Sequence, residues 1–273
     1  MATLVCFHAH PDDEAIGSGG LIRLAADAGH RVVLVVATRG ERGEIMPGVL
    51  DEGEQLALRR TAEVHRAATV LGIARVEFLG YVDSGMIGEP TNDEPWTFWQ
   101  ADVESAARRL AVILEEESAD AITIYDDNGG YGHPDHIQVH RVGMRAAEIA
   151  GVERILEGTI NRTALKRMVA ARAAGDIEEL PEDIELPDLD EATFGVEEDV
   201  ITHVADVSSV ALAKRAALLE HRSQVADDHF FLALPEEAFV GAFGTEWFIG
   251  HGPLTDDGSP VAGIVEPFTP EPV

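Results

Sequence analysis

Hydrophobic residues follow two alternating patterns over the first 150 positions. Short unbroken apolar runs, such as Val32–Ala37, are typical of strands that are buried on both faces of a parallel sheet. Between these runs, apolar residues recur every three or four positions, as on one face of a helix. The predicted strands are Ala2–Phe7, Arg31–Thr38, Val76–Leu79 and Ala121–Tyr125. The predicted helices are Gly17–Gly29, Glu54–Leu71, Ala101–Glu117 and Asp135–Ala150.

This succession predicts an α/β fold with a doubly wound, mostly parallel sheet and right-handed crossovers. We expect the first strand to lie centrally, with the second and third strands on one side of it and the fourth on the other. The strand order would then reverse between the first and fourth strands. Open α/β sheets bind ligands at such a switch point, beyond the C-terminal ends of the strands.

The pattern loosens after Gly151. The acid-rich residues 176–199 are predicted to form an extended surface insert, and the tail from Pro253 to be loosely ordered. We expect a main domain over residues 1–160 and a smaller, irregular C-terminal part over residues 161–273 that packs on it. The predicted elements here are strands at Arg154–Ile160 and Val200–Val207 (an edge strand), helices at Thr163–Ala174 (with a Thr cap) and Ser208–Arg222, and a strand or turn at Thr245–Gly250.

The composition argues against several classes of function. The 273 residues include 50 acids but only 20 Lys and Arg, which gives a formal net charge of −30. Such a surface repels phosphate backbones and anionic lipids, so we expect no nucleic-acid partner and no membrane. The single cysteine, Cys6, lies in the first apolar run, and neither a signal peptide nor a membrane span is predicted. We therefore expect a cytoplasmic protein, whose oligomeric state, a homo-oligomer included, stays open.

Two clusters of histidine and aspartate lie just past predicted strands. His8-Ala9-His10-Pro11-Asp12-Asp13-Glu14 comes after the first strand, and His133-Pro134-Asp135-His136 comes after the fourth. A single His-Pro-Asp turn is most often only a turn, and acids at such a place can simply stabilise the start of a helix. Two clusters at the two strands that border the expected switch point instead predict that they meet over one metal ion.

The residue types of the two clusters together suit a hydrolytic zinc site. His10, Asp13 and His136 provide the two imidazoles and one carboxylate that catalytic zinc binds, with a further position left to water. Zinc lowers the pKa of bound water to about 7. Asp12 adjoins Asp13, so its side chain diverges and can face that water as a general base. Ferrous iron suits the same ligands, so the choice between Zn²⁺ and Fe²⁺ stays open.

The second cluster offers groups for a tetrahedral intermediate. Pro134 suits the first turn of a helix, where its missing N–H costs nothing. With His136 on the metal, His133 is free to act as a cation or as a hydrogen-bond donor toward an oxyanion. We expect Asp135 to orient His133. Tyr131, in a glycine-rich segment, is placed to bring its phenol to the same oxyanion.

Together, Ala9–Glu14 and His133–His136 resemble the paired motifs of the PIG-L (LmbE-like) family, whose members are zinc-dependent de-N-acetylases of N-acetylglucosaminyl conjugates. The resemblance covers residues 1 to about 160 and resumes at Lys214–Leu234, where Ala217–Gln224 is similar to a later block of the family. It implies a Rossmann-like α/β domain, a zinc cofactor and a small amino-sugar conjugate as substrate. From the two clusters we also expect the water proton taken by Asp12 to pass to the leaving amine, with His133 as the alternative acid.

Within this family, Gly129–His136 and Asp83–Met86 resemble the actinobacterial mycothiol enzymes. These are the deacetylase of N-acetylglucosaminyl-inositol and the amidase of mycothiol S-conjugates, and the sequence does not decide between them. The resemblance implies that Arg60 and Asp83 contact the sugar-inositol substrate and that Glu44 lies in a loop that closes over it. The plain alternatives are a helix-surface Arg, a turn Asp and a loop Glu.

A nucleotide-binding module is the alternative from a different class. Gly17-Ser18-Gly19-Gly20 opens a predicted helix after a strand, as in dinucleotide-binding folds. Its spacing misses the dinucleotide fingerprint, and the acids ahead of it would repel a pyrophosphate. Nucleotide binding that survives metal chelation would favour this alternative.

Overall fold

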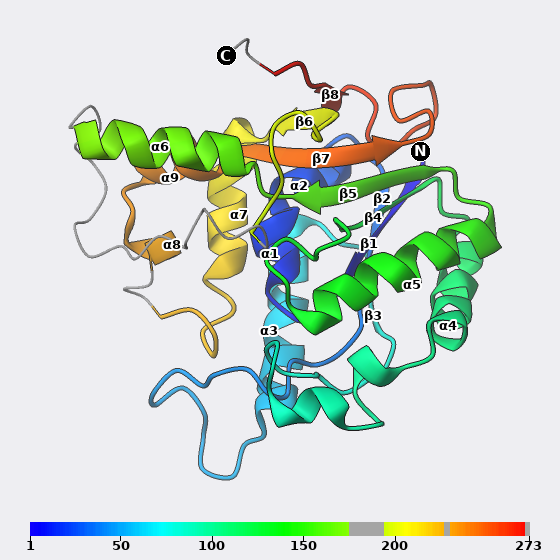
Figure 1. Ribbon diagram of the computed structural model, residues 1–273, viewed down its shortest axis with the longest axis vertical. Coiled ribbons are helices and arrows are strands. Elements are labelled where there is room, and N and C mark those ends of the chain that lie inside the picture. The colour runs from blue at the N-terminus through cyan, green and yellow to red at the C-terminus, as the bar shows by residue number, and fades with distance from the viewer. Residues whose placement is uncertain (175–193, 227–229, 271–273) are drawn as a thin grey trace.

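The computed structural model describes residues 1–174, 194–226 and 230–270. In this part of the chain, eight strands form one sheet in the order β3-β2-β1-β4-β5-β7-β6-β8 (Figure 1). The strands are β1 (Thr3–His8), β2 (Arg31–Val36), β3 (Arg75–Phe78), β4 (Ala121–Tyr125), β5 (Arg154–Thr159), β6 (His203–Asp206), β7 (Thr245–His251) and β8 (Val265–Pro267). The α-helices are α1 (Asp13–Gly17), α2 (Gly19–Asp27), α3 (Leu56–Leu71), α4 (Val103–Glu116), α5 (Pro134–Ala150), α6 (Arg162–Ala174), α7 (Ala211–Leu218), α8 (Phe230–Ala233) and α9 (Glu236–Phe243). Short 3-10 helices are η1 (Pro90–Asp93), η2 (Phe98–Gln100) and η3 (Ser208–Val210).

The strand order confirms the predicted α/β fold. β1 to β5 pair in parallel, with β2 and β3 on one side of β1 and with β4 and β5 on the other. The order of the strands along the chain therefore reverses between β1 and β4. The C-terminal ends of these two strands are the place where such sheets position a ligand site.

Helices cover both faces of the sheet, which explains why its strands are apolar without interruption. Leu4 and Cys6 of β1 belong to a core that includes residues of α2, α3 and α7. Val5 and Phe7 point to the opposite face and belong to a core with α4 and α5. Figure 1 shows α4 and α5 together on one side of the sheet, away from α3 and α7. Because each fully buried Leu, Val or Phe contributes about 1.5–3 kcal/mol, the central strands are held from both sides.

The first helical segment starts earlier than predicted and is broken. α1 begins at Asp13, so the end of the first cluster is helical. Ser18, with φ −141° and ψ 14°, separates α1 from α2. The carboxylate of Glu246, from β7, accepts hydrogen bonds from the N–H groups of Gly20 and Leu21, both at 2.9 Å. A partner from the far end of the chain thus caps α2, and nothing in the local sequence signals it.

The C-terminal part is more regular than predicted. β7 runs antiparallel between β5 and β6, so Thr245–Gly250 forms a strand inside the sheet. The prediction of an edge strand at β6 is wrong, because β8 pairs with it. The tail from Pro253 is also more ordered than predicted, since Leu254, Val261 and Val265 are buried. These apolar residues lie among Pro, Gly and acids, so they show no periodicity that a sequence pattern could reveal.

The cap of α6 differs from the prediction. Oδ1 of Asn161, rather than Thr163, accepts a hydrogen bond from the N–H of Ala164 at 2.8 Å. The hydroxyl of Thr163 donates instead to Oε2 of Glu197 at 2.6 Å. Asn and Thr are both good caps, so the tertiary contact of Thr163 decides between them.

Most of the predicted acidic insert, residues 176–193, lies outside the described residues. Of its remainder, Glu198 forms an ion pair with Arg167 of α6 at 2.8 Å. The domain division near residue 160 stays a prediction, and β5 and β7, on either side of it, pair in one sheet. None of the helices in the described ranges is long and apolar enough to cross a membrane.

Candidate metal centre

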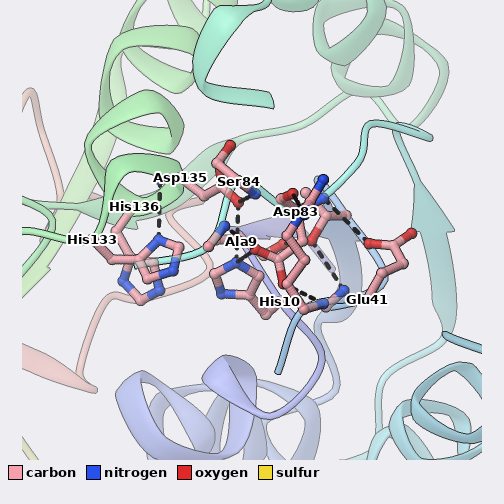
Figure 2. Close-up of polar contacts among 12 residues, drawn as sticks. Ala9, His10, Glu41, Asp83, Ser84, His133, Asp135 and His136 are labelled. Atoms are coloured by element: carbon pink, nitrogen blue, oxygen red, sulfur yellow. Dashed lines mark hydrogen bonds and ion pairs between the residues drawn. The ribbon is translucent and has the colours of Figure 1, made fainter. Parts of the chain in front are cut away.

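The two histidine clusters meet at the switch point of the sheet. His10 lies two residues beyond β1, and His133 and His136 lie at the start of α5, which follows β4. Figure 2 shows the three imidazoles close together. The ring centroids of His10 and His133 are 4.7 Å apart, and those of His10 and His136 are 5.3 Å apart. One ring nitrogen from each histidine lies within 4.8 Å of the others, so the three are placed to hold one ion.

Local sequence explains why the second cluster begins a helix. Pro134 occupies the first turn of α5, where it leaves no N–H unpaired. His133 is the N-cap residue, and its Nδ1 accepts a hydrogen bond from the N–H of Asp135 at 3.1 Å. An accepting Nδ1 carries no proton, so a neutral His133 carries its proton on Nε2. His133 therefore offers one N–H donor, at Nε2.

Asp13 connects the two imidazoles of the predicted ligand set. Its Oδ2 lies 3.4 Å from Nδ1 of His10, and its Oδ1 lies 3.5 Å from Nε2 of His136. The backbone N–H of His10 donates to the same Oδ2 at 2.8 Å, which orients the carboxylate. The fold thus brings His10, Asp13 and His136 together, although they are far apart in sequence.

Two further carboxylates contact His10. Its Nε2 lies 3.2 Å from Oδ2 of Asp135 and 3.6 Å from Oδ1 of Asp83. The backbone N–H of Ser84 donates to Asp135 at 3.0 Å, and the hydroxyl of Ser84 donates to the other oxygen (Figure 2). The predicted contact of the Asp135 carboxylate with His133 is not found among the described residues, although Asp135 does hold His133 through its backbone N–H. The helix start brings the backbone N–H of Asp135 to His133, while its carboxylate points to His10 and Ser84.

These six residues form what we call the histidine–aspartate cluster, namely His10, Asp13, Asp83, His133, Asp135 and His136. Among the described residues, its carboxylates form ion pairs only with histidines. Burial would lower the pKa of His10, but Asp83, Asp13 and Asp135 hold that pKa well above its usual value. Buried charges are normally paired or bound to a metal. A divalent cation would replace the proton of His10 and balance the carboxylates, so this donor set fits a metal ion.

The other two imidazoles are held in their neutral form. Burial, together with the neighbouring His10, lowers the pKa of His133 to about 3. Burial lowers the pKa of His136 to about 4, although Asp13 opposes the change. Neutral imidazole is the form that coordinates metals. Of the two predicted roles for His133, hydrogen-bond donor and cation, the structure favours the donor.

Asp12 lies beside the cluster in an unusual backbone conformation. Its φ is 115°, a region that residues other than glycine rarely occupy. One oxygen of its carboxylate lies 3.2 Å from Nη2 of Arg60. Burial and the neighbouring Asp13 raise the pKa of Asp12 to about 6, although Arg60 opposes the change. A carboxyl with this pKa suits a general base near neutral pH.

Tyr131 reaches the cluster from a glycine-rich loop. Its hydroxyl lies 3.4 Å from Nε2 of His136, and the residue is 39% exposed. Gly129, at φ 66°, allows this approach, because a Cβ at that position would lie 2.5 Å from Cβ of His136. The N–H of Gly130 donates to Asp126 at 2.8 Å and holds the loop at its base.

The three predicted substrate contacts lie in different surroundings. Asp83 belongs to the histidine–aspartate cluster. Arg60 is buried and donates to two backbone carbonyls, at 3.0 and 2.5 Å, so its guanidinium supports the loop around Asp12. Glu44 is exposed and is not brought to the cluster; its backbone carbonyl accepts from the amide of Gln224 at 3.1 Å. Contact of these residues with substrate stays a prediction.

Sequence reasoning missed Tyr125, the last residue of β4. Its ring stacks on that of His136, with centroids 4.2 Å apart and an angle of 10° between the planes. Its hydroxyl accepts from the N–H of Ala9 at 3.2 Å and contacts Nδ1 of His8 at 2.9 Å. An aromatic residue at the end of the strand before the second cluster was the available signal. Tyr125 thus positions His136 through its ring and is connected to the first cluster through its hydroxyl.

Known proteins identify the class to which this fold and cluster belong. Residues 5–147 match the family model described as PIG-L, GlcNAc-PI de-N-acetylase. The chain belongs to this family and is a deacetylase, a hydrolase of a linear amide. The resemblance drawn from the two motifs is therefore confirmed.

Individual relatives match the chain over most of its length. The 1D-myo-inositol 2-acetamido-2-deoxy-alpha-D-glucopyranoside deacetylase of Thermomonospora curvata is 40% identical, over 92% of this chain and 92% of its own. The protein of the same name from Acidothermus cellulolyticus is also 40% identical, over 91% of this chain and 88% of its own.

Solved structures share the fold. N,N'-diacetylchitobiose deacetylase from Pyrococcus horikoshii superposes with a TM-score of 0.59 at 21% identity, over 91% of this chain and 83% of that chain. The zinc-inhibited form of teicoplanin deacetylase Orf2 gives a TM-score of 0.57 at 18% identity, over 90% of this chain and 97% of that chain. At these identities the similarity concerns the α/β architecture.

Proposed function

We propose that this protein is a zinc-dependent deacetylase that removes the acetyl group of 1D-myo-inositol 2-acetamido-2-deoxy-alpha-D-glucopyranoside. One observation carries the proposal. A buried histidine–aspartate cluster lies at the switch point of a chain that is 40% identical, over more than nine-tenths of its length, to deacetylases of that substrate. The relatives thereby favour the deacetylase over the S-conjugate amidase, which the sequence alone left open.

His10, Asp13 and His136 would hold the ion, with Asp83 and Asp135 close enough to orient His10. When bound, zinc lowers the pKa of a water molecule to about 7 and polarises the substrate carbonyl. Ferrous iron suits the same donors. The charge of the cluster supports this assignment, because among the described residues its carboxylates form ion pairs only with imidazoles.

Asp12 takes the proton of the attacking water and then delivers it to the leaving amine. Its raised pKa, about 6, lets the carboxyl accept and release a proton near neutral pH. His133 is the less suitable acid. With its Nδ1 accepting from the backbone, a neutral His133 could donate only its Nε2 proton and would become an imidazolate.

His133 and Tyr131 stabilise the oxyanion of the tetrahedral intermediate. The Nε2–H of His133 is a neutral donor held by the N-cap geometry of α5. The hydroxyl of Tyr131 comes from the glycine-rich loop that directly precedes His133, and it lies 3.4 Å from Nε2 of His136. Removing one preorganised oxyanion donor typically costs about 10²–10³-fold in kcat. Arg60, Asp83 and Glu44 remain the proposed contacts of the sugar-inositol part.

The proposal is tested by measuring amine release from this N-acetylglucosaminyl-inositol and, in parallel, from a mycothiol S-conjugate. We expect a higher kcat/KM on the first substrate, its loss after chelation, and its recovery when zinc is returned. A higher kcat/KM on the S-conjugate would replace the deacetylase with the amidase. Turnover that persists in metal-free protein would overturn the metal assignment.

A further inference from the structure

We propose that His221 is a positioning residue for the reaction, and that it holds the general base Asp12 in place through the carboxylate of Glu14. The inference rests on the proposed role of Asp12. His221 follows α7 and lies more than 200 residues after the cluster motif that it supports. It belongs to Ala217–Gln224, the second segment that resembles the family. The proposed reaction assigns no role to any residue of this segment.

A continuous line of hydrogen bonds connects His221 to Asp12. Nε2 of His221 lies 2.6 Å from Oε1 of Glu14. The second oxygen of Glu14, Oε2, accepts the backbone N–H of Asp12 at 2.9 Å. The side chains of His221 and Glu14 are both 0% exposed, so water does not compete for these contacts. Glu14 therefore uses one oxygen for His221 and the other for the base.

The backbone of Asp12 needs such support. A non-glycine residue in a sparsely populated region of φ and ψ, such as Asp12 at φ 115°, is strained and persists only when its surroundings hold it. Arg60 holds the Asp12 carboxylate from one side, at 3.2 Å. Glu14 holds the backbone N–H from the other side. If Glu14 turned away, the Asp12 peptide would be free to relax and the carboxylate would leave its position beside the cluster.

The use of a single imidazole nitrogen shows what His221 contributes. Its Nε2 contacts Glu14, whereas its Nδ1 is buried without a hydrogen-bond partner among the described residues. Its function thus depends on a single N–H donor, at Nε2, and on the distance of that donor from Cα. Gln places its amide nitrogen the same number of bonds from Cα as Nε2 of histidine, whereas the amide nitrogen of Asn corresponds to Nδ1. Gln at position 221 should therefore keep the hydrogen bond to Glu14, whereas Asn should lose it.

A purely structural role predicts a different outcome, and the chain contains a matched control. Lys214 of α7 and Glu246 of β7 form another buried pair, with Nζ and Oε1 2.8 Å apart. Like Glu14, Glu246 also accepts backbone N–H groups, but those belong to α2 and not to a reacting residue. Loss of Lys214 should therefore affect stability without affecting the base.

The experiment compares purified His221→Gln, His221→Asn and Lys214→Met with the wild-type enzyme, using the N-acetylglucosaminyl-inositol substrate. We expect His221→Asn to lose about 10- to 100-fold in kcat, as is usual when the partner of a functional group is removed. Its KM and zinc content should not change. His221→Gln should keep kcat near the wild-type value, and Lys214→Met should lower the melting temperature while keeping kcat.

Three results would overturn the inference. They are equal kcat values for the Gln and Asn variants, loss of zinc together with activity in His221→Asn, and failure of both amide variants to fold while Lys214→Met folds. The proposed function is judged separately by the wild-type protein and by Asp12→Asn. If Asp12→Asn is inactive and His221→Asn is fully active, only the role of His221 fails. If Asp12→Asn is active, the base assignment fails first.

Discussion

The histidine–aspartate cluster and the contact of α7 with the N-terminal helices both bury charged side chains, but they balance charge differently. Beside α7, two buried acids are each paired with their own base. Lys214 lies 2.8 Å from Glu246, and His221 lies 2.6 Å from Glu14. In the cluster, several carboxylates share the imidazoles and, among the described residues, contact no Lys or Arg side chain.

This difference shows that burial alone does not mark the functional site. A buried acid with a matched base is complete within the folded chain. Buried acids in excess carry a desolvation penalty of several kcal/mol for each ion unless another charge balances them. Such an arrangement suits a protein that gains the missing positive charge from a bound cation. Substitutions in the two regions should therefore differ in whether they change zinc content and turnover or the stability of the fold.

His136→Ala should have the largest effect, because it removes a ligand from the cluster. We expect the purified variant to lose stoichiometric zinc by elemental analysis and to lose activity with it. His140→Ala is the matched control. It lies one turn further along α5, where Nδ1 of His140 contacts the backbone carbonyl of Tyr125 at 3.1 Å. Full zinc content in His136→Ala would contradict the ligand set.

Asp12→Asn should separate chemistry from metal binding. The variant keeps the shape of the side chain but cannot take a proton, so we expect kcat to fall about 10²–10⁴-fold. Zinc content should stay at the wild-type level. Asp127→Asn, an exposed aspartate in the glycine-rich loop, serves as the control and should keep wild-type turnover. Wild-type kcat in Asp12→Asn would refute the base assignment.

Lys214→Met should affect stability rather than chemistry. It leaves Glu246 buried without its cation, which typically costs about 3–5 kcal/mol in the free energy of unfolding. Thermal and denaturant unfolding measure this loss, and steady-state kinetics of the folded variant should give the wild-type kcat. A fall in kcat without a fall in stability would show that the two regions are not separate in the way we infer.

Besides the loss of the substrate contact proposed for Arg60, Arg60→Met should give the smallest effect on the base, a shift in the midpoint of the pH profile. The base must be ionised, so kcat/KM rises with pH through the pKa of Asp12, which burial raises to about 6. A cation in the cluster moves this midpoint to lower pH. Loss of the Arg60 charge removes stabilisation of the Asp12 carboxylate, so the midpoint should move up by about one pH unit. Arg60→Lys keeps the charge and should leave the midpoint in place; an unshifted profile in Arg60→Met would contradict the assignment.

The central sheet and the cluster were predictable because both depend on local signals. Unbroken apolar runs located β1 and β4. The first cluster motif begins at the end of β1, and the second begins eight residues after β4. Because β1 and β4 are neighbouring parallel strands, the motifs that follow them meet at the same edge of the sheet. The N-cap at His133 and Pro134 is equally local.

Contacts between distant segments were not predictable. The sequence suggested that Asp135 would orient its neighbour His133, but its carboxylate contacts His10 and Ser84. The contact of His221 with Glu14 gave no signal either. For the stacking of Tyr125 on His136, the sequence offered only an aromatic residue at the end of a strand. The edge position predicted for β6 was wrong, and β8 was not predicted, for the same reason: the strands that pair with them lie far away along the chain.

By itself, the amino-acid sequence determined the α/β class, the order of the first strands and the donors that gather at the switch point. It could do so because hydrophobic periodicity and chain adjacency are properties of short segments. Only the tertiary structure decided which carboxylate orients which imidazole, how Asp12 is held, and in which order the last three strands extend the sheet. Those outcomes depend on side-chain direction and on packing between segments as much as 200 residues apart, where a hydrogen bond forms or fails within about an ångström.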